Sequence, residues 1–67
     1  MSAYIIEAKG EIKEAFHYDR PVSADSEKGI LEYARATYGA DATLRRMTEE
    51  EAANFALHGP DFFVKKN

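Results

Sequence analysis

Cysteine and tryptophan are absent from this chain of 67 residues, which contains only two prolines. Without cysteine the chain has neither a disulfide nor a thiolate metal site. A chain of this length buries only about 60% of the surface that its unfolded form exposes. We therefore expect its support to come from tight packing of a helix on a sheet, or from a partner subunit.

Basic charge and long apolar runs are also scarce. Nine Lys and Arg against twelve Asp and Glu give a net charge of −3, which argues against a general grip on nucleic-acid phosphates. The unbroken apolar runs are too short for a membrane span. Residues 1–3 lead directly into a strand pattern, so no signal peptide is expected. These features predict a cytoplasmic protein.

The composition, 45% hydrophobic and 31% charged, is typical of a folded chain, and we expect a single domain over residues 1–67. Its central stretch, residues 22–39, has the pattern of one amphipathic helix together with the end of the strand that precedes it, with Ser26, or Asp25, as the N-cap and Gly39 at the end. The apolar stripe of this helix consists of Ile30, Leu31, Ala34 and Tyr38.

Gly29 lies inside this predicted helix, where glycine costs about 1 kcal/mol relative to alanine. One interpretation is that the first turn packs closely on the sheet. The other is that a ligand or partner approaches the helix at this position.

Alternation of apolar and polar residues predicts the strands. Residues 3–9 form a first strand, in which Ile5 is either exposed or covers something on the second face. Residues 12–24 form one long second strand, or a loop through Glu14 followed by a strand to Ser23. Residues 42–47 form a third strand, in which Arg45 and Arg46 point to opposite faces.

After the third strand, Thr48 and Glu51 have the spacing of a capping box and predict a short helix, Glu49–His58. A β-hairpin around Gly59 is the alternative. In both cases residues 62–66 form a last strand, so the fold class is α+β, with a small antiparallel sheet packed by one main helix. The predicted core consists of Ile6, Phe16, Tyr18, Val22, Ile30, Ala34 and Leu44.

The chain offers no recognisable catalytic set. His17 and His58 lack the spacing of a metal site. Ser23, Ser26 and Thr48 are explained as strand-end and capping residues rather than nucleophiles. We expect a protein that is not an enzyme and that uses neither a metal nor another cofactor.

Aromatic and paired basic residues indicate binding instead. Exposed tyrosine and arginine are the residue types that anchor protein interfaces. The basic pairs Arg45-Arg46 and Lys65-Lys66 form one positive patch if the third and last strands pair. The predicted partner-binding residues are Tyr33, Tyr38, Arg45, Arg46, Phe63 and Lys65.

Several segments resemble small phage-borne anti-CRISPR proteins, in particular a type I-F inhibitor of β-β-α-β-β plan. The similar segments are Tyr4-Ile5-Ile6, Val22-x-Ala24 leading to Ser26, Ala34, and Thr43-Leu44-Arg45-Arg46-Met47. The resemblance implies an inhibitor that binds a CRISPR effector complex, with Arg46 as a contact. The chain differs from that pattern in having Leu31-Glu32 where the inhibitor's helix is basic, and a capping box where the inhibitor forms a hairpin.

Two hypotheses follow for function. The first is a non-enzymatic phage or mobile-element protein that binds and inhibits a host protein or ribonucleoprotein complex. The second is a small nucleic-acid-binding or regulatory module that uses Arg45, Arg46, Lys65 and Lys66, although the acidic balance disfavours direct nucleic-acid binding. Because aromatic residues exceed what so thin a core holds, we also expect a two-fold homodimer.

Overall fold

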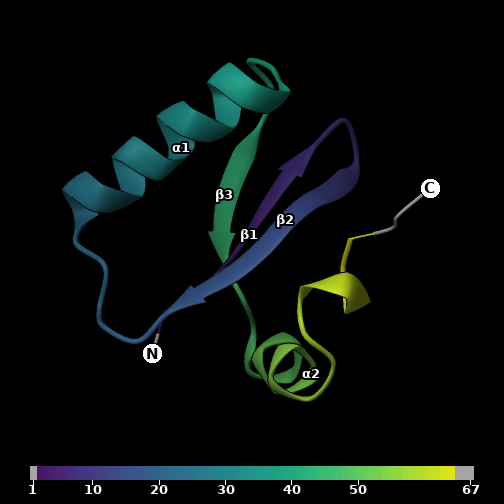
Figure 1. Cartoon of the computed structure of the whole chain (residues 1–67). Coiled ribbons are helices and arrows are strands. Elements are labelled where there is room, and N and C mark those ends of the chain that lie inside the picture. The colour runs from purple at the N-terminus through teal and green to yellow at the C-terminus, as the bar shows by residue number, and fades with distance from the viewer. Residues whose placement is uncertain (1, 65–67) are drawn as a thin grey trace.

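The computed structural model describes residues 2–64, which form a three-stranded sheet with helices on both sides (Figure 1). The strands are β1 (Ser2–Ala8), β2 (Glu11–Tyr18) and β3 (Thr43–Arg46). The helices are α1 (Ala24–Tyr38), α2 (Glu49–His58) and the short 3-10 helix η1 (Pro60–Phe62). The predicted α+β class is confirmed.

The sheet has the order β2-β1-β3, and β1 pairs antiparallel with both neighbours. Lys9 and Gly10 join β1 to β2 and both have positive φ angles, 55° and 75°. Two such residues form the tight turn whose twist suits a hairpin. The first two strands therefore form a β-hairpin.

A β-bulge at Lys13 changes the alternation of β2. Ile6 pairs with Glu14, but the next residue of β1, Glu7, pairs with Ile12, so Lys13 is the extra residue. Such a bulge reverses which side chains face which way along a strand. Ile12 therefore lies on the opposite face from Phe16, although uninterrupted alternation along residues 12–24 would place the two on one face.

The second strand is shorter, and the central helix longer, than predicted. β2 ends at Tyr18, and residues 19–23, which include Pro21, form a connection without regular structure. The N-cap of α1 is Ser23, whose hydroxyl accepts a hydrogen bond from the Ser26 backbone N–H at 3.2 Å. The prediction of Ser26 or Asp25 as the cap is wrong, because Ser23 satisfies the first-turn donor one turn earlier.

The core lies between α1 and the sheet. Its buried members are Ile6, Ala8, Ala34 and Ala42, and the partly buried Phe16, Ile30, Tyr38 and Leu44 pack against them. The prediction is wrong for Tyr18, which is 43% exposed, and for Val22, which is half-buried outside this cluster. Tyr18 is at the end of β2, where α1 leaves the sheet uncovered, and Val22 lies in the connection between β2 and α1.

The opposite face of the sheet is also covered. Ile5 points to this face and is fully buried, which confirms the alternative in which it covers something there. Two contacts bring α2 to this side: Arg45 of β3 pairs with Glu51, and the ring of His17 lies 5.3 Å from that of Phe55. Figure 1 shows α1 and α2 on opposite sides of the sheet.

The capping box of α2 is present as predicted. The Thr48 hydroxyl accepts from the Glu51 backbone N–H at 3.2 Å, and the Glu51 carboxylate accepts from the Thr48 N–H at 3.0 Å. The helix Glu49–His58 ends at Gly59, whose φ is 77°. The helix interpretation is therefore confirmed, and the alternative hairpin is wrong.

The last predicted strand, residues 62–66, is wrong for the part that the structure describes. Phe62 ends η1, and the Val64 N–H bonds back to the Pro60 carbonyl at 3.2 Å. A backbone folded in this way does not present its N–H groups to a neighbouring strand. Lys65 and Lys66 lie outside the described residues.

Candidate protein-docking surface

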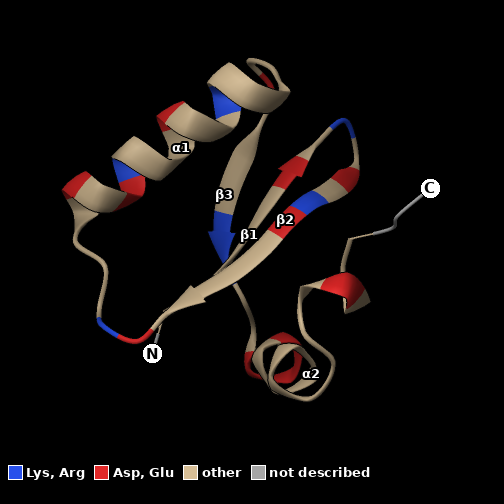
Figure 2. Ribbon diagram, viewed as in Figure 1, with Lys and Arg blue, Asp and Glu red and all other residues tan. Residues whose placement is uncertain are grey.

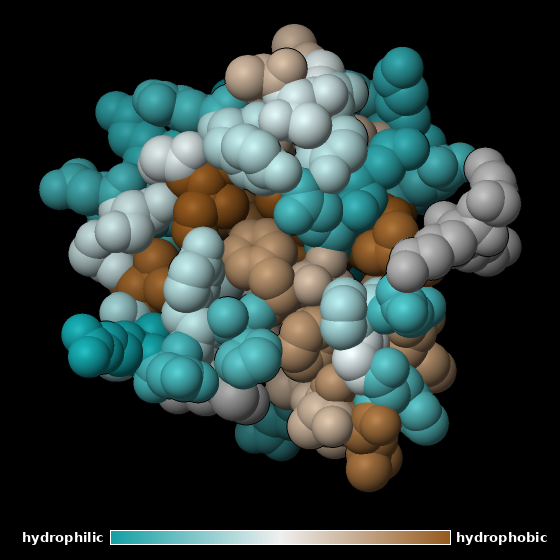
Figure 3. Space-filling model, viewed as in Figure 1, coloured by the Kyte–Doolittle hydropathy of each residue, from teal (hydrophilic) through white to brown (hydrophobic). Residues whose placement is uncertain are grey.

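A hollow surface lies between α1 and β2, and we name it the α1–β2 groove. One hollow of about 420 Å³ is lined by Glu14, Phe16, Tyr18, Ser26, Gly29, Ile30 and Tyr33. A second of about 370 Å³ shares three of these residues and extends along residues 20–23. Figure 3 shows hydrophobic surface in this region, between α1 and the sheet.

The groove is open because α1 crosses the sheet diagonally. The first turn of α1 lies near β3, where Glu27 binds Arg46. Its last turn lies over β2, where Tyr38 binds Glu14. The first half of α1 therefore leaves the second half of β2 uncovered. Tyr18 remains 43% exposed and Tyr33 50% exposed as a result.

Glu14 fixes the wall of this groove. The hydroxyls of Tyr33 and Tyr38 both donate to the same carboxylate oxygen, Oε2, at 2.6 Å. The hydrogen bond to Glu14, followed by burial, raises the pKa of each tyrosine above its usual value of 10.0. Both rings are thus held neutral and in fixed positions, which lowers the entropy that a docking partner must remove.

Gly29 lies at the edge of the groove and has no packing role among residues 2–64. A Cβ added there meets nothing within 4 Å, and the residue is exposed. The interpretation that Gly29 lets the helix pack closely on the sheet is therefore wrong. Its cost of about 1 kcal/mol in the helix has no compensation among the described contacts.

The two predicted arginines point to opposite faces, as expected, and both are paired within the chain. Arg45 donates to Glu7 at 2.6 Å and to both oxygens of Glu51, at 2.7 and 2.9 Å. The hydrogen bond from Arg45, with the backbone bond from Thr48, lowers the pKa of Glu51 to about 2. Arg45 is therefore a structural cation and not a free phosphate ligand.

Arg46 lies on the face of the sheet that α1 covers, beside the first turn of that helix. Its guanidinium donates to Glu27 at 3.2 Å, and the Tyr4 hydroxyl donates to the same oxygen at 2.6 Å. The hydrogen bond from Tyr4, followed by that from Arg46, holds the pKa of Glu27 below its usual value. A separate hollow of about 340 Å³ adjoins this pair.

The structure does not bring the six predicted binding residues together. Tyr33 and Tyr38 meet at Glu14, whereas Arg46 lies beside Glu27. Phe63 packs against Phe55 and Phe62, with ring centroids 6.3 and 5.1 Å apart. Lys65 lies outside the described residues. Figure 2 shows the basic end of β3 and the acidic first turn of α2, so the local charges are mixed.

Residues that sequence reasoning missed form most of the groove: Phe16, Tyr18, Ser26 and Ile30. Three of them, Phe16, Tyr18 and Ile30, have the alternation or helical spacing of core residues and are predicted as such. The one signal of the groove in the sequence is Gly29. Glycine destabilises the interior of a helix, so its presence there indicates a packing or binding role.

Residues 2–64 contain no group of three or more His, Cys, Asp or Glu side chains that could hold a metal ion. No helix in that part of the chain has the length and apolar character needed to cross a bilayer. Comparison with protein-family models, curated proteins and solved structures finds no match to this chain.

Proposed function

We propose that the protein is a non-catalytic protein-binding protein and that the α1–β2 groove is its docking surface. The observation that carries this proposal is Gly29, an uncompensated glycine beside two half-exposed tyrosines, Tyr18 and Tyr33. Because glycine has no side chain, another backbone can approach the helix closely between these aromatic side chains. Tyrosines in such positions are typical anchors of protein interfaces.

The chemistry of the groove supports binding over catalysis. Its one carboxylate, Glu14, already accepts two tyrosine hydroxyls, so it is poorly placed to take a proton from a substrate. The tyrosines themselves are stabilised in the neutral form. These groups orient each other and leave no activated nucleophile among them.

In its narrower form the proposal concerns a host defence complex. The resemblance to type I-F anti-CRISPR proteins suggests that the partner is a CRISPR effector complex in the cytoplasm of a host cell, and that binding blocks target DNA. Direct nucleic-acid binding is the weaker candidate, because Arg45 and Arg46 are both engaged by carboxylates.

Target-DNA binding by a purified type I-F effector complex tests this proposal. Fluorescence anisotropy of a labelled target duplex is followed while the protein is added. The wild-type chain is expected to reduce DNA binding, and Gly29→Arg to lose that effect, because arginine fills the edge of the groove. Ala53→Arg is the matched control, since Ala53 is an exposed helical position on α2.

Each outcome bears on a different part of the proposal. If the wild-type chain leaves DNA binding unchanged, the proposal of a type I-F effector as partner is wrong. If Gly29→Arg inhibits as well as Ala53→Arg does, the partner binds elsewhere and the groove is not the docking surface.

A further inference from the structure

The edge of the sheet beside the groove is formed by β2. Within residues 2–64 this strand pairs with β1 on one side, and no strand pairs with its other side. The bulge at Lys13 disrupts its first half, whereas Glu14–Tyr18 pair regularly with β1. An unpaired strand edge of this kind is a template for a further strand.

We propose that in the free protein a second copy covers the groove. The two β2 strands pair antiparallel about a two-fold axis at His17 and join the two sheets into one. This inference rests on the proposed function, because it concerns the same groove. The second copy regulates access to that groove. A foreign partner then binds only after it displaces the second copy.

The end of β2 is complementary to itself in this register. With His17 facing its counterpart, Phe16 of one copy faces Tyr18 of the other, twice by symmetry. Both residues lie in the regular part of β2, which ends at Tyr18. Aromatic pairs of this kind stabilise neighbouring strands.

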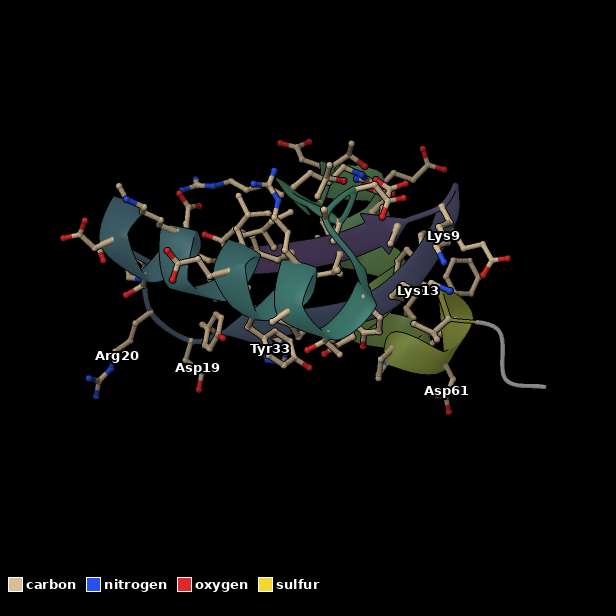
Figure 4. The ribbon with its side chains drawn as sticks, turned by 90° about the horizontal axis from the view of Figure 1, so that it is seen from above. Lys9, Lys13, Asp19, Arg20, Tyr33 and Asp61 are labelled. Atoms are coloured by element: carbon tan, nitrogen blue, oxygen red, sulfur yellow. The ribbon has the colours of Figure 1, made fainter. Side chains whose placement is uncertain are left out.

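The position of the side chains agrees with this arrangement. Phe16, like Glu14 and Tyr18, lies on the face of the sheet that α1 covers only in part. A two-fold axis perpendicular to the joined sheet keeps both α1 helices on that face, so the two grooves lie beside each other. Figure 4 shows Asp19, Arg20 and Tyr33 projecting on one side of the molecule, where the second copy would lie.

Sedimentation equilibrium from low to high micromolar concentration is the first measurement. We expect the wild-type chain to be a dimer at the upper end. Gly29→Arg should raise the Kd of the dimer by at least about tenfold, while Ala53→Arg should leave this Kd unchanged. A monomer mass at every concentration overturns the inference. Groove-dependent inhibition of the effector complex by such a monomer would leave the proposed function standing.

A cysteine scan tests the register, because the chain has no cysteine of its own. Facing residues of antiparallel strands have Cα atoms about 4.5–5.5 Å apart, which suits a disulfide. His17→Cys should therefore link to itself under mild oxidation. Residue 18 of one copy is displaced by two residues, about 7 Å along the strand, from residue 18 of the other, so Tyr18→Cys alone should not link.

Mixing Tyr18→Cys with Phe16→Cys supplies the positive control for that register, because residues 16 and 18 face each other. The mixed disulfide is expected to form faster than either self-disulfide. If His17→Cys links no faster than Tyr18→Cys, or if the mixture gives no mixed disulfide, the proposed strand pairing is wrong even where the protein is dimeric.

Discussion

Arg45 of β3 donates two hydrogen bonds to Glu51 of α2, at 2.7 and 2.9 Å, and a third to Glu7 of β1 at 2.6 Å. The Glu51 carboxylate also accepts from the Thr48 backbone N–H at 3.0 Å. One carboxylate thus caps α2 and fixes it to the sheet. Since α2 has no buried residue of its own, its position depends strongly on this ion pair.

Replacing the arginine tests that dependence. Arg45→Leu leaves Glu7 and Glu51 without their cation, and we expect a loss of roughly 1–2 kcal/mol in the free energy of unfolding, since these groups are partly exposed. Arg46→Leu is the control, because its side chain is 67% exposed, and should cost under about 1 kcal/mol. Urea unfolding measures both. Equal losses would contradict the structural role of Arg45.

The same carboxylate predicts a dependence of stability on pH. The folded protein lowers the pKa of Glu51 from its usual value near 4.5 to about 2. A carboxyl whose pKa falls on folding stabilises the protein at pH values above its pKa in the unfolded chain. This contribution is lost as the pH falls through the pKa of the carboxyl in the folded protein. Stability should therefore decrease between about pH 4.5 and pH 2. Glu51→Gln should flatten the decrease in that window, measured by urea unfolding at each pH.

Ala34 tests the core beneath α1. Its side chain is fully buried between helix and sheet, so Ala34→Asp places an unpaired carboxylate among apolar side chains. We expect a loss of about 3 kcal/mol or more. Ala36→Asp on the same helix is exposed and should cost about 1 kcal/mol or less. Thermal unfolding followed by circular dichroism compares the two, and similar melting temperatures would mean that the buried face is wrongly assigned.

Local signals in the sequence were sufficient to predict much of the fold. The capping box at Thr48 and the alternation around Ile6 each depend on residues close together in the chain. The bulge at Lys13 was not predictable in this way, because it depends on pairing with β1. The last predicted strand is wrong because a short apolar run such as Phe62-Phe63-Val64 occurs in a folded-back segment as well as in a strand.

The candidate site was less predictable than the fold. Tyr33 was identified from its place on the helix, but its partner Glu14 lies 19 residues away in sequence. The groove exists because α1 crosses the sheet diagonally, and no local pattern encodes that crossing angle. Arg45 and Arg46 were correctly placed on opposite faces, but their carboxylate partners on other elements were not predictable from spacing.

Gly29→Ala separates the stability of the chain from its binding. Because a Cβ at this position meets nothing within 4 Å, alanine should raise the free energy of unfolding of the monomer by about 1 kcal/mol. Gly39→Ala is the contrasting control: φ there is +120° and a Cβ lies 3.1 Å from Asp41, so alanine should destabilise the protein by about 1 kcal/mol. Urea unfolding at low protein concentration measures both changes.

If Gly29→Ala stabilises the monomer while it weakens dimerisation in sedimentation, the glycine is retained for binding at the expense of stability. If it stabilises the monomer and leaves the dimer unchanged, the glycine does not admit the second copy, and that part of the docking surface is wrongly assigned.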